Sequence, residues 1–270
     1  MYNRLLIILG IAIIIILFSH IRYYYRVSDS IYISQMHDYD ETKLFNLIDT
    51  KNPFIIENFK ILNDSLHDLD FEILNDNLDK KVDFFSSDPF IFPESKINKS
   101  ILEYNKLFMD SKNSVSIFMN PKIINILDIN IPNYIYKLFG PLDLFINSSL
   151  TISKEYSKTG LMSHNYNKFF VHMIKGNSKI YLFSPSQEIY LHKTFQPNTH
   201  KFNCSLVNPW KYDSKKFPDY SKAGYIEITL NEGQILSIPP HWWFYMYDNS
   251  DTISLQYYSH NIYTKIKNFF

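Results

Sequence analysis

The 270-residue chain has only one cysteine, Cys204, and only two alanines, Ala12 and Ala223. The lone cysteine excludes an internal disulfide, which a domain of this size does not need, and the absence of cysteine pairs favours a reducing compartment. The formal net charge is zero, so the sequence gives no electrostatic reason to expect a nucleic-acid partner. The chain is instead rich in aromatic residues, and its 21 tyrosines and 22 phenylalanines can supply a sizeable core.

An apolar run near the N-terminus, LLIILGIAIIIILFSHI at residues 5–21, predicts a membrane-spanning helix. Such a helix is roughly 25 Å long, slightly short for a hydrocarbon core of about 30 Å. Arg4 precedes the run, and RYYYR at residues 22–26 follows it with side chains typical of a membrane interface. The alternatives are a cleaved signal peptide, for which FSHIRYYYR lacks the small-x-small cleavage pattern, and a buried core helix, for which the run lacks amphipathicity.

Residues 1–26 are therefore interpreted as a membrane anchor and residues 27–270 as one domain, since no repeat or low-complexity linker interrupts the second part. Arg22 and Arg26 follow the span, whereas Arg4 and the amino terminus precede it. The positive-inside rule thus slightly favours a single-pass protein with a cytoplasmic domain, and the single cysteine favours the same side.

The first half of the domain mixes short helices with short strands. ETKLFNLID at residues 41–49 has apolar residues on one helical face, and NPFIIENF at residues 52–59 predicts a strand. PKIINILDI and PNYIYKLFG predict two short helices that begin at Pro121 and Pro132.

From Leu142 onward the pattern is mostly β. The strand-like segments are DLFINSSLTIS, KFFVHMIKG, SKIYLFSP, GYIEITL, QILSIPP and TISLQYYSH. Strict alternation in YIEITL indicates a half-buried strand, and a run of short strands after a partly helical first half favours a barrel or sandwich with helices outside. The residues expected to be mostly buried are Val171, Ile180, Leu182, Ile226, Ile228 and Leu236.

Two longer segments carry a recognisable order of motifs: GLMSHNYNKFFVHMIKGNSKIYLFSPSQEIYL at residues 160–191 and VNPWKYDSKKFPDYSKAGYIEITLNEGQILSIPPHWWFYM at residues 207–246. Together with NPFIIENF, they resemble the cupin-like, jumonji-C hydroxylase family over about residues 40–260. The resemblance implies a mainly β fold with flanking helices, namely a double-stranded β-helix of the cupin or jelly-roll type, preceded here by the transmembrane helix. In active members it also implies Fe(II) held by two histidines and one aspartate, with 2-oxoglutarate chelating the same ion.

The family's H-x-D motif falls on residues that provide no carboxylate. Aligned on the glycine of MIKG, its positions are Ser163, His164 and Asn165; aligned on the glycine of TGLM, they are His164, Asn165 and Tyr166. His164 is therefore the one candidate metal ligand, and a hydrogen-bonded strand histidine is the favoured interpretation of it.

The other family positions are also changed. The distal histidine corresponds to Phe244, which cannot coordinate a metal, and the lysine that pairs the 2-oxo acid corresponds to Ser178, with Lys179 next to it as a candidate cofactor contact. His241 is expected in a turn. The aromatic residues Trp242, Trp243 and Phe244 are expected to fill the core.

The leading hypothesis is a membrane-anchored cupin-like domain without the Fe(II)/2-oxoglutarate triad, which acts as a binding or scaffolding module and needs no cofactor. The alternative is an active 2-oxoglutarate-dependent protein hydroxylase with Fe(II) held by rearranged ligands, such as His164, His172 and Glu227. A third hypothesis, a glycan- or lipid-modifying membrane protein, has no specific motif behind it. The expected partners are the membrane, through residues 5–21, and a protein, but not nucleic acid.

Overall fold

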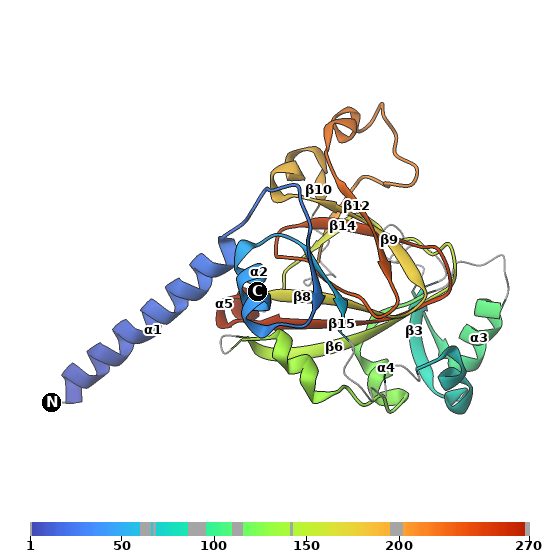
Figure 1. The fold of residues 1–270 in the computed structure, drawn as a ribbon, viewed down its shortest axis with the longest axis horizontal. Helices are drawn as coiled ribbons and strands as arrows, with labels where there is room; N and C mark the ends of the chain where they lie inside the picture. The colour runs from blue at the N-terminus through green and yellow to red at the C-terminus, as the bar shows by residue number, and fades with distance from the viewer. Residues whose placement is uncertain are drawn as a thin grey trace.

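The computed structural model describes residues 2–59, 66, 69–85, 96–109, 116–140, 143–194 and 202–267, and these residues are mostly β with flanking helices (Figure 1). The α-helices are α1 (Tyr2–Tyr25), α2 (Glu41–Thr50), α3 (Ile101–Met109), α4 (Pro121–Ile126) and α5 (Ile262–Lys267). Short 3₁₀ helices are η1 (Phe71–Asn77), η3 (Asn133–Leu138), η4 (Pro185–Tyr190) and η5 (Pro218–Lys222).

The strands form two sheets. One has nine strands in the order β1-β2-β13-β8-β15-β6-β5-β3-β4, and the other has six in the order β10-β11-β7-β14-β9-β12. The bounds are β1 (Ser34–Asp38), β2 (Phe54–Asn58), β3 (Lys81–Phe85), β4 (Lys96–Ser100), β5 (Ser116–Asn120), β6 (Leu144–Ser153), β7 (Met162–His164), β8 (Lys168–Lys175), β9 (Asn177–Phe183), β10 (Lys193–Thr194), β11 (Phe202–Ser205), β12 (Ile226–Asn231), β13 (Ile235–Ser237), β14 (Trp243–Asp248) and β15 (Thr252–His260).

The chain passes repeatedly from one sheet to the other. Strands β6, β7, β8 and β9 alternate between the nine-stranded and the six-stranded sheet, and β12, β13, β14 and β15 alternate in the same way. Hydrophobic side chains from both sheets therefore meet in one core, which includes Val171, Leu182 and Leu236. The helices α2, α3 and α4 cover the outer face of the nine-stranded sheet and bury a second core that includes Leu44 and Tyr104.

The expected helices and strands are confirmed in most places. The helix at residues 41–49 is α2, which Asp40 caps by accepting a hydrogen bond from the Lys43 amide at 2.9 Å. The segment that begins after Pro132 is a 3₁₀ helix rather than an α-helix, and the lone cysteine, Cys204, lies buried on β11.

The burial expectation holds for four of its six residues, which are Val171, Ile180, Leu182 and Leu236. Ile226 and Ile228 are only partly buried, because β12 is the edge strand of the six-stranded sheet and has a neighbour on one side only.

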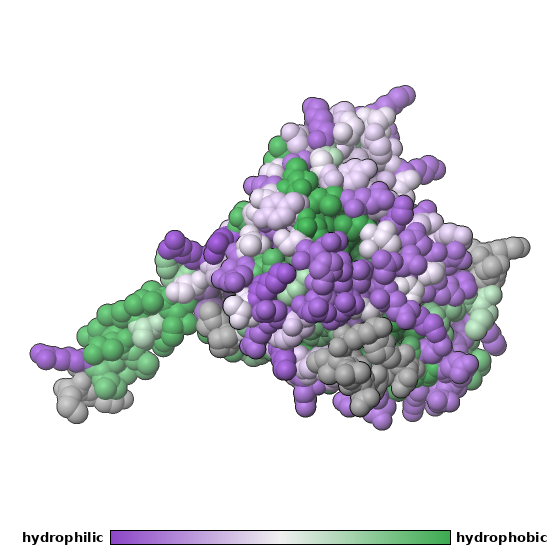
Figure 2. All heavy atoms as spheres, viewed as in Figure 1, coloured by the Kyte–Doolittle hydropathy of each residue, from purple (hydrophilic) through white to green (hydrophobic). Residues whose placement is uncertain are grey.

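Helix α1 projects from the rest of the molecule (Figure 1). Its surface is mostly hydrophobic along its length, and hydrophilic residues lie where it joins the domain (Figure 2). Its last turn packs on the domain. Tyr24 is fully buried, with its ring 4.7 Å from that of His241, and the Tyr25 hydroxyl lies 2.7 Å from the Tyr263 hydroxyl of α5. His241 is in a turn with a φ of 70°, as expected, and its Nε2 donates to the Tyr24 carbonyl at 3.2 Å.

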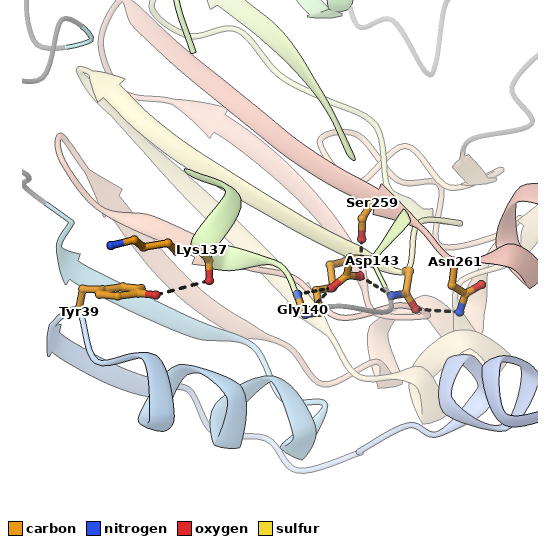
Figure 3. Close-up of polar contacts among 8 residues, drawn as sticks. Tyr39, Lys137, Gly140, Asp143, Ser259 and Asn261 are labelled. Carbon is orange, nitrogen blue, oxygen red and sulfur yellow. Dashed lines mark hydrogen bonds and ion pairs between the residues drawn. The ribbon is translucent and has the colours of Figure 1, made fainter. Parts of the chain in front are cut away.

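The buried carboxylate of Asp143 holds several segments together (Figure 3). Its Oδ2 lies 2.7 Å from the ammonium of Lys168 on β8 and accepts the Gly140 amide at 2.8 Å. Its Oδ1 accepts from Asn167 and from Ser259 on β15, both at 2.7 Å. One carboxylate thus satisfies donors from three places in the chain, which is the condition under which a buried charge is tolerated.

The same network reaches α1. The side-chain amide of Asn261 donates to the Asn167 side chain at 3.1 Å and to the carbonyl of His20 in α1 at 3.4 Å. The end of the apolar helix is therefore joined to the domain through polar groups as well as through aromatic packing.

Replacing Asp143 with alanine should lower the free energy of unfolding by about 3–5 kcal/mol, because Lys168 would retain a buried charge without its partner. The measurement is urea unfolding of the full chain in detergent, followed by tryptophan fluorescence. The double replacement Asp143→Ala with Lys168→Met should recover part of the loss. Lys179→Met, which removes an exposed ion pair, is the control and should leave the midpoint nearly unchanged. An Asp143→Ala variant as stable as the wild type would contradict this role.

Candidate functional site

A narrow cavity lies between the two sheets, where the resemblance to the hydroxylases would place an active site. Its volume is about 20 Å³, which leaves room for little more than one water molecule. The walls come from β5, β6, β8, β14 and β15, and include Thr151, Phe169, Val171, Phe244, Met246, Asp248 and Gln256.

His164 on β7 is completely buried, and both of its ring nitrogens are engaged with the backbone. Nε2 donates to the Ile238 carbonyl at 2.9 Å, and Nδ1 accepts from the Tyr166 amide at 3.2 Å. A carbonyl can only accept and an amide N–H can only donate, so these contacts fix the neutral tautomer. Burial lowers the pKa of His164 to about 3, which keeps the ring neutral. No lone pair remains on this imidazole for a metal ion.

The residues around His164 offer no charged ligand. Ser163 and Asn165 both accept hydrogen bonds from the side-chain amide of Asn203 on β11, at 3.1 and 3.2 Å. Tyr166 is buried and stacks on Tyr258 with ring centroids 4.3 Å apart. These three side chains therefore take part in packing and in strand-to-strand hydrogen bonding.

Phe244, which the resemblance aligns with the distal histidine, is buried and lines the cavity. It stands opposite Met162 in the β7–β14 ladder, and its ring centroid lies 6.0 Å from that of Phe169. The two preceding tryptophans are also buried: Trp242 donates to the Lys51 carbonyl at 3.2 Å and Trp243 to the Glu188 carboxylate at 3.0 Å. The expectation that this aromatic run fills core is confirmed.

Ser178 and Lys179 lie on opposite faces of β9. Ser178 is buried and donates to Asp248 Oδ1 at 2.5 Å. Lys179 is exposed on the outer face, where its ammonium lies 3.1 Å from the carboxylate of Glu227. The lysine thus points away from the cavity.

Asp248 is the residue in the cavity that motif comparison missed. Burial raises the pKa of the Asp248 carboxyl to about 7. Hydrogen bonds from Ser178 and Ser153 favour the ionised form and act in the opposite direction, but burial has the larger effect. Period-two alternation along β14 places Phe244, Met246 and Asp248 on one face, so the sequence did contain the signal.

The remaining polar groups of the cavity bond to one another. Gln256 accepts from the hydroxyls of Ser149 and Thr151 at 3.3 and 3.2 Å and donates to the Ser254 hydroxyl at 2.9 Å. Lys158 stands at the rim, with its ammonium 5.3 Å from the centroid of the Trp210 ring. The cavity therefore offers hydroxyl and amide groups and one buried carboxyl.

The alternative ligands His164, His172 and Glu227 are not brought together. Nδ1 of His172 lies 3.3 Å from the Tyr257 hydroxyl, and its ring lies 6.3 Å from that of Phe59 in the core beneath the helices. Glu227 is on the outer face of the other sheet with Lys179. Across the described residues, no group of three or more His, Cys, Asp or Glu side chains is arranged to hold a metal ion.

Comparison with curated proteins finds several relatives. An HSPB1-associated protein 1 homolog of Danio rerio is 34% identical over 100 residues, which cover 37% of this chain and 22% of that protein. Human HSPB1-associated protein 1 is 31% identical over 99 residues, covering 37% of this chain and 20% of that protein. A lysine-specific demethylase 8 of Xenopus tropicalis is 27% identical over 158 residues, covering 56% of this chain and 33% of that protein.

The chain spans about a fifth of the length of the first of these relatives. JmjC domain-containing protein D of Dictyostelium discoideum is 36% identical to this chain over a shorter stretch of 86 residues, which covers 32% of this chain and 19% of that protein. The family model described as "Cupin-like domain" matches residues 50–265, which include every strand of both sheets except β1. The resemblance seen in the motifs is thereby confirmed, and the chain belongs to the cupin-like, jumonji-C-related family.

Proposed function

We propose that this chain is a membrane-anchored cupin-like domain that has kept the family scaffold without the Fe(II)/2-oxoglutarate chemistry and acts as a binding or scaffolding module. The observation that carries the proposal is the state of His164, whose two ring nitrogens are both used by backbone groups. Phe244 supports it, because an apolar ring occupies the position of a second ligand.

The cavity also fails to suit the co-substrate. 2-Oxoglutarate carries two carboxylates, and the resemblance implies a lysine that pairs with it, whereas Ser178 stands at the aligned position and donates to Asp248 in the cavity wall. The cavity volume of about 20 Å³ is also too small for this acid. The residues present therefore do not fit Fe(II) with 2-oxoglutarate.

We further infer that the two sheets are the halves of a double-stranded β-helix, as the alternation of strands between them supports. We assign residues 1–26 to the anchor and residues 27–270 to the domain. A protein partner is the expected ligand of this module. The names of the HSPB1-associated relatives, which state an association with another protein, support that expectation.

The anchor proposal is supported by α1 itself. Residues Arg4–Tyr25 are long and apolar enough to cross a membrane, although a signal sequence would meet the same test of length and composition. Only 6% of the most apolar window is buried, which argues against a core helix. The packing of Tyr24 on His241 and of Tyr25 on Tyr263 makes the helix end part of the folded domain, which argues against its removal.

The full chain in detergent, reconstituted anaerobically with Fe(II), should retain far less than one iron per chain and should release no succinate from 2-oxoglutarate. Phe244→His alone should not restore activity, because Asn165 and Tyr166 still provide no carboxylate. The measurements are metal content after desalting and succinate detection, with an active family member as the positive control. One tightly bound iron per wild-type chain would establish rearranged ligands and the alternative, an active hydroxylase.

Asp248→Asn should change how stability depends on pH. Between about pH 4 and about pH 7 the unfolded carboxyl is ionised while the folded one, with its pKa raised by burial, keeps its proton. Raising the pH through this range therefore favours unfolding of the wild type but not of the variant. The variant's stability relative to the wild type should rise by up to about 4 kcal/mol, corresponding to about three pKa units.

Urea unfolding at several pH values measures this difference. His164 is present in both proteins, so its own opposite dependence on pH cancels in the comparison. A difference in stability that stays constant from pH 4 to pH 7 would contradict a protonated Asp248.

The orientation can be tested with the sequons at Asn98 and Asn147, both of which are exposed. With a cytoplasmic domain, translation into microsomes should give a product that resists alkaline extraction and carries no glycan at these two residues. A sequon added ahead of Met1 is the positive control and should be modified. Glycans on Asn98 or Asn147 would place the domain in the lumen.

A further inference from the structure

An aromatic residue at the start of β6 has a backbone conformation that costs free energy. Phe145 has a φ of 53°, in the left-handed region that glycine adopts readily and bulky side chains rarely do. Its side chain is 53% exposed, so burial in the folded domain does not offset this cost. Strain of this kind persists only where the surrounding structure holds it in place, and it is concentrated at functional sites.

A β-bulge holds Phe145 in this position. The ladder between β6 and β15 shifts register between Tyr258 and His260, where β6 has one residue more than β15. The side-chain amide of Asn147 donates to the Phe145 carbonyl at 2.7 Å and fixes the local backbone. Bulges re-aim side chains, and this one leaves Phe145 exposed although β6 is buried from Ser149 onward.

Phe145 lies beside α5, and Figure 1 shows α5 next to the base of α1. The ammonium of Lys265 is 5.0 Å from the centroid of the Phe145 ring, and the ammonium of Lys267 is 5.1 Å from that of Tyr24 in α1. Ile266, between the two lysines, is 47% exposed. These residues form one surface, the α5 patch, which consists of Phe145, Lys265, Ile266 and Lys267.

The position and the charge of the α5 patch indicate what it contacts. Under the proposed anchoring, the last turn of α1 and the α5 helix packed on it lie at the depth of the lipid headgroups. Aromatic side chains favour this depth, and lysines beside a span attract anionic headgroups. Arg22 and Arg26, both exposed, add charge of the same sign. Glu188 also lies near Lys267, but its carboxylate is 3.1 Å from the ammonium of Lys193.

We propose that the α5 patch is a second membrane-contact surface, at which the domain itself touches the bilayer. Phe145 and Ile266 enter the interface beside α1, and Lys265 and Lys267 bind the headgroups of anionic lipids. The strained backbone at the bulge is what presents the aromatic ring to the lipid. The surface rests on the proposed anchoring, because α1 brings the patch to the bilayer.

The experiment introduces a tryptophan into the patch of the full chain, as Phe145→Trp, in vesicles of equimolar phosphatidylcholine and phosphatidylglycerol. Lipids brominated near the headgroup end of the acyl chains should quench the emission that the variant adds to that of the wild type. Ile266→Trp is a second reporter and should also be quenched. The matched control is Tyr225→Trp, which replaces an exposed aromatic residue of the other sheet's edge. Quenching of both reporters no stronger than that of the control would overturn the proposal.

The lysines are tested by changing which lipid carries the bromine. The added emission of Phe145→Trp should be quenched more by brominated phosphatidylglycerol than by brominated phosphatidylcholine, since each lysine at the surface enriches anionic lipid up to about fivefold. Adding Lys265→Gln and Lys267→Gln should bring the two quenching constants together. Lys179→Gln, at an exposed lysine of β9, should leave them apart. Equal quenching by the two lipids without any lysine replaced would overturn the assignment to anionic lipid.

Phe145→Gly separates a role at the membrane from a role in the fold. Glycine adopts a positive φ without penalty, and the side chain that is removed is exposed. The midpoint of thermal unfolding in detergent should therefore equal or exceed that of the wild type. A clearly lower midpoint would show that Phe145 serves the fold, and would overturn the proposal.

The anchoring is tested separately by alkaline extraction of membranes that contain the full chain. A chain that alkali removes, but whose Phe145→Trp emission is still quenched when it is added to brominated vesicles, contradicts the anchoring and not the patch. A chain that stays in the membrane while both reporters remain unquenched contradicts the patch and not the anchoring.

Discussion

The buried carboxylate of Asp143 is the constraint on which the arrangement of this molecule depends. It lies just before β6, binds the ammonium of Lys168 on β8 and accepts from Ser259 on β15, so it fixes the ends of three neighbouring strands of the large sheet. Through Asn167 and Asn261 the same network holds the end of α1. A charge in this position must have all its partners in place, and this requirement links the strands to the helix.

The scaffold and the family's chemistry can separate because different residues support them. The shared core between the sheets is built by aliphatic residues such as Ile180, Leu182 and Leu236, which do not line the cavity. The resemblance aligns the ligand positions with Phe244 and with His164, and both ring nitrogens of His164 bond to the backbone. Both side chains are buried and pack in the core: the ring of His164 lies 4.9 Å from that of Phe169, and the ring of Phe244 lies 6.0 Å from it.

Much of the fold could be predicted because apolar strand-like runs recur after Leu142, with clear alternation in β12. Strand β7 has only three residues and β10 only two, which is too short for any periodic signal, so their pairing was not predicted. His164 shows the same limit at the site. Its Nε2 binds a carbonyl 74 residues away, and no side-chain pattern encodes a backbone acceptor. Asp248, in contrast, could have been found from its spacing after Phe244.

The close packing of α1 on α5 has a mechanical consequence. Tyr24 and Tyr25 contact His241 and Tyr263 directly, so the helix meets the domain through a stiff joint and not through a flexible tether. The apolar run of roughly 25 Å is shorter than a bilayer core of about 30 Å, and a short span is accommodated by local thinning of the bilayer. If α1 spans a membrane as proposed, this joint would transmit the mismatch: a thicker bilayer would draw the whole domain toward the lipid surface, and bilayer thickness would set the distance of the domain from the membrane.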